Sequence, residues 1–118
     1  MAVALNQIGQ QSLTVSGSPV GLTTPLVTTG ELTNPMTGAR NRMRARGFMV
    51  QVHNQPVRWR ADGTNPTGAV EDNLLLPGDV LDLTEPSYDY WGMCRLIKFI
   101  TDTTATGDAT LEIAYFGQ

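Results

Sequence analysis

The sequence predicts an all-β protein, an antiparallel β-sandwich of jelly-roll type formed by residues 1–118 as a single domain. Three observations support this prediction. Short runs alternate apolar and polar residues at the two-residue period of a strand, turn-forming residues separate the runs, and no window shows the period of a helix. A chain of 118 residues is long enough to bury a core without a metal ion or a disulfide.

Six segments have the length and composition of strands: residues 11–16, 47–53, 55–61, 80–83, 95–100 and 109–116. Side chains two positions apart in a strand share a face, so each run presents one apolar face to the other sheet. We therefore expect one shared core, formed by Phe48, Val50, Val57, Trp59, Ile97, Phe99, Leu111 and Ile113.

Turn signals separate these strands. Pro77-Gly78-Asp79 is typical of a β-turn with proline at its first central position. Residues 53–56 predict a tight link between two strands, and residues 62–68 predict a longer loop.

Two segments do not fit the alternating pattern. Residues 1–10 are polar with scattered apolar residues, and we interpret them as an N-terminal arm. Residues 17–46 combine a Thr-, Gly- and Pro-rich stretch with an arginine-rich stretch, and we interpret them as an extended loop. Because such a loop buries little apolar surface, we expect residues 21–46 to be mobile in the isolated protein and to become ordered against another chain.

Composition excludes several functional classes. The net charge of −3 argues against general nucleic-acid binding, which needs a basic surface. No run of about 18 apolar residues is present, so we expect no membrane span. The N-terminal residues lack the pattern of a signal peptide, and the single cysteine, Cys94, allows no disulfide within the chain. These features suit folding in a reducing cytoplasm.

Catalytic residues are scarce, and we predict that the protein is not an enzyme and has no cofactor or metal. The chain has one histidine, His53, which we place at a surface turn, and Cys94, which we expect to be buried and inert. A Cys-His pair stays possible but has no support in the sequence. Four carboxylates, Asp79, Asp82, Glu85 and Asp89, match no calcium-loop spacing, so we interpret them as turn and edge residues.

The most unusual feature is a strip of alternating arginines, Arg40, Arg42, Arg44 and Arg46, which holds half of the eight basic residues. In an extended segment all four guanidinium groups would point to one side. Three interpretations stay open: a solvated strand, a docking strip for carboxylates of another chain, and a DNA contact. The overall acidity makes the last the weakest.

Aromatic residues form a second candidate site. Tyr88, Tyr90 and Trp91 follow one another in a segment with Pro and Gly, where such residues serve as interface anchors or close the core. Trp59 alternates with Arg58 and Arg60, which can stack bases or sugars, although a core position for Trp59 fits the strand pattern better.

Several motifs occur in the order found in a group of small structural proteins of tailed bacteriophages. They are GQQSLTVS at residues 9–16, PVRWRADGTNPTG at 56–68, LLLPGDVLDL at 74–83 and RLIKFITDTTATGDATLEIAYF at 95–116. The chain resembles that group over residues 9–22 and 46–116, and it departs from the pattern in the longer, arginine-rich stretch between them.

The resemblance implies a virion protein without enzymatic activity, assembled in the host cytoplasm. The expected role is a capsid decoration (cement) protein that binds the major capsid protein and stabilises the assembled head, as a homo-oligomer, with a trimer favoured. The alternatives are a neck, tail or baseplate protein of the same fold, or a carbohydrate-binding module for adsorption to the host. No membrane or direct nucleic-acid contact is expected.

Overall fold

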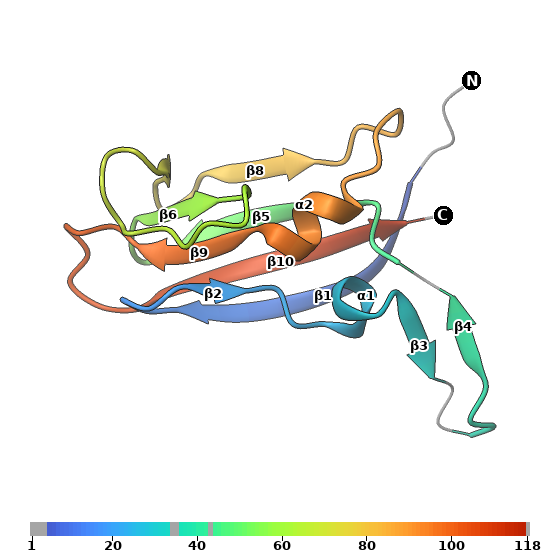
Figure 1. Ribbon diagram of the computed structural model, residues 1–118. Helices are drawn as coiled ribbons and strands as arrows, with labels where there is room; N and C mark the ends of the chain where they lie inside the picture. The colour runs from blue at the N-terminus through green and yellow to red at the C-terminus, as the bar shows by residue number, and fades with distance from the viewer. Residues whose placement is uncertain (1–4, 34–35, 43, 118) are drawn as a thin grey trace.

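Two four-stranded antiparallel sheets face each other in the computed structural model, which describes residues 5–33, 36–42 and 44–117 (Figure 1). Sheet A has the order β1-β10-β5-β8, and its strands are β1 (Asn6–Val15), β10 (Ala109–Gly117), β5 (Gly47–His53) and β8 (Val80–Leu83). Sheet B has the order β2-β9-β6-β7, and its strands are β2 (Val20–Gly21), β9 (Lys98–Thr101), β6 (Val57–Arg60) and β7 (Asn73–Leu75). The predicted all-β sandwich is confirmed.

Strand pairing is nested along the chain. The first strand pairs with the last, β1 with β10, and inside this pair lie β2 with β9, β5 with β8, and β6 with β7. All of these pairs are antiparallel. Sheet A is joined into one sheet by the pairing of β10 with β5, and sheet B by the pairing of β6 with β9.

The core lies between the two sheets and matches the predicted set closely. Seven of the eight predicted residues are buried in one cluster: Phe48, Val50, Val57, Ile97, Phe99, Leu111 and Ile113. The eighth, Trp59, is only half-buried and packs against the edge of this cluster. Alternation along the strands therefore identified the inward faces correctly.

Two local features of the sequence also agree with the structure. Strands β5 and β8 occupy the predicted residues 47–53 and 80–83. The predicted turn is closed by a hydrogen bond from Asp79 N–H to Leu76 C=O at 2.9 Å, with Gly78 at φ +92°. Only glycine adopts that φ at little cost, which is why the turn needs it.

The prediction of an N-terminal arm over residues 1–10 is wrong for residues 6–10, while residues 1–4 lie outside the described residues. Strand β1 begins at Asn6 because its partner β10 extends to Gly117, directly opposite. A register shift between Gln7 and Gly9 allows the pairing to continue past the irregularity. The sequence did not indicate this strand because its N-terminal half is largely exposed and therefore lacks regular alternation of apolar and polar residues.

The prediction of an extended loop over residues 17–46 is also wrong for much of that segment. It contains β2, the short helix α1 (Pro25–Thr28), and a hairpin of β3 (Glu31–Thr33) and β4 (Arg40–Arg42). Leu22, Leu26 and Val27 are buried in the core cluster. Two of these side chains, Leu26 and Val27, belong to the single helical turn that begins at Pro25, where proline is favoured.

A third difference concerns residues 95–100, which were predicted to be one strand. A second helix, α2 (Trp91–Leu96), includes Arg95 and Leu96, and β9 begins only at Lys98. Cys94 N–H donates to Tyr90 C=O at 2.9 Å and Ile97 N–H to Met93 C=O at 2.8 Å, so helical bonds satisfy the backbone here. The helix is too short to show a 3.6-residue period in the sequence.

Candidate interaction site

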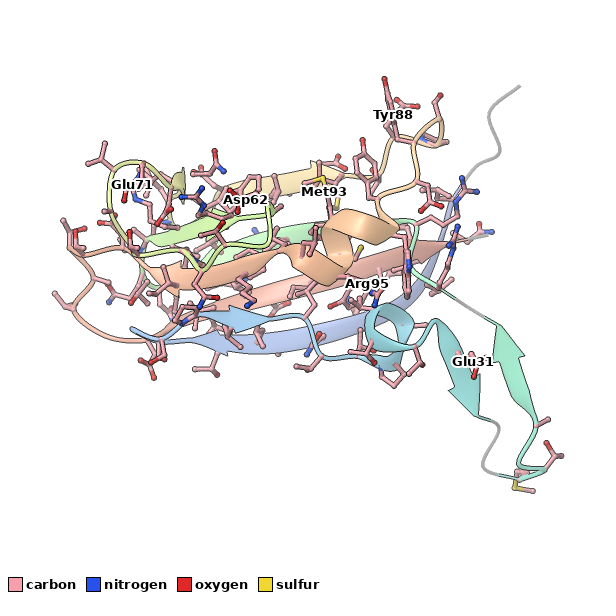
Figure 2. All side chains as sticks on the ribbon, in the orientation of Figure 1. Glu31, Asp62, Glu71, Tyr88, Met93 and Arg95 are labelled. Carbon is pink, nitrogen blue, oxygen red and sulfur yellow. The ribbon has the colours of Figure 1, made fainter. Side chains whose placement is uncertain are left out.

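The structure brings the two candidate sites of the sequence together. Part of the arginine strip and the aromatic segment meet where the β3–β4 hairpin leaves the sandwich (Figures 1 and 2). We call this group the arginine–aromatic cluster, and its members are Arg44, Arg46, Tyr88, Asp89, Tyr90, Trp91 and Arg95.

Backbone hydrogen bonds place these residues. Arg46 N–H donates to the C=O of Phe116 in β10 at 2.8 Å, and Arg46 C=O accepts from Tyr90 N–H at 2.8 Å. One residue earlier, Ala45 N–H donates to the C=O of Leu26 in α1 at 2.9 Å. The chain that follows the hairpin is therefore tied to helix α1, to sheet A and to the start of helix α2.

Asp89 is the electrostatic centre of the cluster. Its carboxylate accepts a hydrogen bond from the Arg44 guanidinium, lies 3.9 Å from Arg46 Nε, and accepts the N–H of Trp91 at 3.0 Å. One interpretation of the arginine strip was docking on carboxylates or carbonyls of another chain, and for Arg44 and Arg46 the structure shows a carboxylate of their own chain instead, while docking itself stays a prediction. They face Asp89 of their own chain because backbone pairing already holds that carboxylate between them.

Arg40 and Arg42 stand apart from this arrangement. Their backbone lies in β4, paired with β3, at the register Arg40 with Thr33 and Arg42 with Glu31. The positions of their side chains are outside the described part of the structure, so their docking role stays a prediction. Of the four arginines, the structure describes the side-chain contacts of Arg44 and Arg46, and both lie next to Asp89.

Trp91 lies beneath two cations. The guanidinium carbons of Arg44 and Arg95 lie 5.7 Å and 5.6 Å from its ring centroid. Such cation–π contacts contribute about 0.5–1 kcal/mol each at exposed sites. A side-chain methyl placed on Gly30 would lie 3.1 Å from the Arg44 Cβ and 3.3 Å from the Trp91 ring. The ring of Trp91, the first residue of α2, therefore packs close to Gly30 beside the hairpin and lies beneath two arginines.

Of the two tyrosines, only Tyr88 projects into solvent. Its side chain is 63% exposed at the tip of the loop before α2 (Figure 2), and its ring centroid is 6.1 Å from that of Tyr90. Tyr90 packs against the core cluster. Tyr88 is therefore suited to anchor a partner, whereas Tyr90 has the structural role that the sequence left open.

The two residues that the sequence offered for nucleophilic catalysis, Cys94 and His53, lie in different elements, α2 and β5. Cys94 is unpaired and completely buried, as predicted, and burial together with the charge of Asp89 raises the pKa of its thiol to about 12. A neutral buried thiol is a poor nucleophile. His53 lies at the end of β5, next to the turn at Asn54 with φ +76°. Within the described residues, no three His, Cys, Asp or Glu side chains gather as metal ligands.

The four clustered carboxylates have local structural roles, as expected of turn residues. Each accepts a backbone N–H within three positions of itself: Asp79 from Leu76, Asp82 from Thr84, Glu85 from Ser87, and Asp89 from Trp91. These bonds stabilise consecutive turns between β7 and α2.

The arginines of β6 are neutralised within the chain. Arg58 Nε donates to the largely buried Asp102 at 2.7 Å, and Arg60 donates to Asp62 at 2.6 Å. The Thr104 hydroxyl and Arg58 lower the pKa of Asp102 to about 2. These pairs connect the loops that follow β9 and β6, which contain Asp102 and Asp62, to the arginines of sheet B. Since each cation has an acidic neighbour, Arg58 and Arg60 do not offer phosphates an unpaired basic surface.

A second buried carboxylate, Asp72, anchors the loop after β6. Burial alone would raise its pKa, but the N–H groups of Thr67 and Gly68, together with the charge of Arg60, outweigh burial and lower it. Those two N–H groups donate to Asp72 Oδ2 at 2.8 Å and 3.0 Å. The Asp, Thr and Gly residues of the loop after β6 therefore have a structural role, because they hold this loop in place.

Sequence reasoning missed Asp89 and Arg95 as members of the cluster, and it missed Gly30 as a residue packed against Arg44 and Trp91. One signal was present: Asp89 is the acid between Tyr88 and Tyr90, and it could have been matched to the arginine strip by charge. Its distance from the strip along the chain gave no reason to choose it over Asp82 or Glu85.

Comparison of the chain with protein family models, with curated proteins and with solved structures found no match. In the part of the chain that the structure describes, no helix has the length and apolar character needed to cross a bilayer.

Proposed function

We propose that this chain is a non-enzymatic structural protein that acts by assembly, as a capsid decoration (cement) protein of a tailed phage. The observation that supports assembly is the β3–β4 hairpin, which extends away from the sandwich while its base is tied to it (Figure 1). The phage assignment comes from the sequence motifs, and the alternative is a neck, tail or baseplate protein of the same fold.

The hairpin is suited to contact another molecule. A two-stranded hairpin is marginally stable on its own in water, so extending one away from the core favours a role in which a neighbour covers it. Met36, between its strands, is 90% exposed. Arg40 and Arg42 add positive charge to a chain whose net charge is −3. We propose that the hairpin docks on an acidic surface of the major capsid protein.

The nested strand pairing supports the jelly-roll assignment. In a jelly roll an eight-stranded ribbon folds so that outer strands pair with each other and inner strands pair inside them, across two sheets. The pairs β1–β10, β2–β9, β5–β8 and β6–β7 follow that rule. This fold leaves the hairpin as an insertion between the second and third strands of the ribbon.

The mechanism is thermodynamic linkage. A protein that binds the assembled lattice better than loose subunits stabilises the lattice by the difference in binding free energy. Several weak contacts from one homo-oligomer, for which we propose a trimer at a three-fold or quasi-three-fold position, would add through avidity. The proposed location is the virion, after assembly in the host cytoplasm.

The carbohydrate-binding alternative receives less support. A sugar platform needs accessible aromatic faces, but two guanidinium groups lie over Trp91, and Trp59 and Tyr90 pack against the core. Tyr88 alone is largely exposed among these four rings. A single exposed tyrosine is a better protein anchor than a sugar platform.

The location is tested by the copy number of this chain in purified particles of the phage that encodes it, measured by quantitative mass spectrometry. A decoration protein is expected in numbers comparable to the major capsid protein. A copy number far below this would support the neck, tail or baseplate alternative, and absence from the particle would contradict the proposal.

The docking role is tested with an Arg40→Ser/Arg42→Ser variant in a co-sedimentation assay with particles that lack the protein. We expect a folded variant that binds more weakly, and wild-type binding that weakens as salt rises. Lys98→Ser, which removes a positive charge from the sandwich, is the control. Normal binding by the double variant at every salt concentration would contradict docking through the hairpin.

A further inference from the structure

Strand β1 is the long edge of this sandwich. The sheet order places β1, β8, β2 and β7 at the four borders. Strands β2, β7 and β8 have only 2, 3 and 4 residues, and β8 carries Asp82, whereas β1 has 10 residues. Proteins avoid unwanted strand pairing by keeping edge strands short or charged. Three edges of this sandwich follow that rule, and β1 does not.

The chemistry of β1 permits another strand to pair with it. Its segment, NQIGQQSLTV, contains no charged residue and no proline. Within residues 5–33, 36–42 and 44–117, the backbone hydrogen bonds of β1 are those of its ladder with β10. The other border of the strand therefore offers N–H and C=O groups that lack a backbone partner, which is the template that strand addition uses.

The strand is also held rigidly from its inner side. The Gln11 side chain accepts a hydrogen bond from the buried Tyr115 hydroxyl at 2.7 Å and donates one to Thr23 Oγ1 at 2.9 Å. On the outer side, Gln10, Ser12 and Thr14 are exposed. A rigid edge loses little conformational entropy when a partner binds, so it is preorganised for pairing.

We propose that β1 pairs with β1 of a second copy of this chain, antiparallel and across a two-fold axis, so that two copies of sheet A become one continuous sheet. Self-pairing sets the strand against itself, so any charge that it carried would be repeated on both sides and would repel. The absence of charge from β1 fits this occupant in particular.

The register follows from the irregularity in β1. Pairing with β10 is regular from Gly9 to Val15, and the centre of that stretch is Ser12. A two-fold axis at the centre sets Ser12 opposite Ser12 of the second copy, and Gln10 opposite Thr14 on either side. Both pairs lie on the exposed outer face, where small and polar side chains cross the junction without a steric or electrostatic conflict.

This contact does not depend on the proposed virion role. The β1–β1 contact by itself gives a dimer. Combined with a separate contact that forms trimers, it gives a hexamer. In both cases the solution mass is an even multiple of the 12.8 kDa chain mass.

The test uses analytical ultracentrifugation of the full chain and two variants, Ser12→Lys and Ser12→Glu. Each variant sets like charges opposite each other at the axis, and we expect the dissociation constant of this contact to rise by at least about tenfold. A mixture of the two variants sets opposite charges there and is expected to restore association. Gln51→Lys, which adds the same charge to the outer face of β5 away from the edge, should leave the mass unchanged.

Circular dichroism verifies that each variant is folded before its mass is compared. A wild-type chain that is a monomer or a plain trimer over the accessible concentration range would overturn the proposal. An unchanged even-numbered mass in both Ser12 variants would overturn it as well, because the contact would then lie elsewhere. Failure of the mixed sample to associate would exclude the two-fold register at Ser12.

Discussion

The guanidinium of Arg44 donates a hydrogen bond to the carboxylate of Asp89 across 45 positions of sequence. The two residues lie on opposite sides of a junction, one just after the β3–β4 hairpin and the other just before helix α2. Their ion pair, together with the cation–π contact between Arg44 and Trp91, connects the base of the hairpin to the sandwich. We therefore expect this pair, together with the backbone hydrogen bonds of Ala45 and Arg46, to set the direction in which the hairpin leaves the sandwich.

Replacement of Asp89 tests this dependence. In Asp89→Asn the charges of Arg44 and Arg46 lose their partner, and we expect the backbone amides of residues 31–42 to exchange hydrogen faster. The free energy of unfolding should change by no more than about 1 kcal/mol, because the pair is partly exposed. Hydrogen exchange read by mass spectrometry gives the first quantity, and urea unfolding gives the second. The control is Asp108→Asn, and equal exchange in both variants would show that the pair does not hold the hairpin.

Acid should destabilise the protein through its buried carboxylates. The pKa of Asp102 is lowered from 3.8 to about 2 by Thr104 and Arg58, and the pKa of Asp72 is also lowered. The unfolded chain then binds more protons than the folded one, so stability is complete above about pH 4 and is lost as pH falls toward the folded pKa.

The variant Asp102→Asn separates this contribution from the rest. It leaves the partly buried Arg58 without its carboxylate, and we expect the free energy of unfolding at neutral pH to fall by about 3 kcal/mol. We also expect stability to depend less steeply on pH between 4 and 2 than in the wild type. Urea unfolding at several pH values measures both effects, and a pH profile unchanged by the substitution would remove Asp102 as a source of acid sensitivity.

Cys94 should resist thiol reagents while the protein is folded. Its side chain is buried and its pKa is raised to about 12, so at pH 8 the folded thiol is almost entirely protonated. We expect labelling by an aromatic disulfide reagent to be slow in the native protein and fast in urea. Because the unfolded thiol ionises near its ordinary pKa of 9.0, stability should also decline as pH rises above that value. Rapid native labelling would show that the α2 region opens readily.

Gly30 should not tolerate a side chain. Its φ of +70° is costly for alanine, and a Cβ would lie 3.1 Å from that of Arg44 and 3.3 Å from the Trp91 ring. We expect Gly30→Ala to lower the free energy of unfolding by about 1–3 kcal/mol. Gly17, where a Cβ would meet no atom within 4 Å, provides the matched control, and Gly17→Ala should be close to neutral. Thermal unfolding of both variants measures the difference, and equal melting temperatures would contradict the tight packing at Gly30.

Short edge elements were difficult to recognise in the sequence for a physical reason. In β7 only Leu75 is buried, and β2 consists of two half-buried residues, so neither has enough alternation to indicate a strand. Both become strands because their neighbours in sheet B, β6 and β9, supply hydrogen-bond partners. Helix α2 similarly depends on the burial of Cys94 against the core, and its six residues show no helical period in the sequence.

By itself, the sequence determined the fold class and the inward faces of the long strands, because alternation at the two-residue period is a local property that burial of one face requires. It identified Phe48, Val50, Leu111 and Ile113 as core residues, and Cys94 as a buried thiol. Only the tertiary structure decided which charges meet. Arg44 pairs with Asp89 and Arg58 pairs with Asp102 because strand pairing brings these distant backbone segments together. Ion pairs depend on the distance between charges in space, which the separation of residues along the chain does not show.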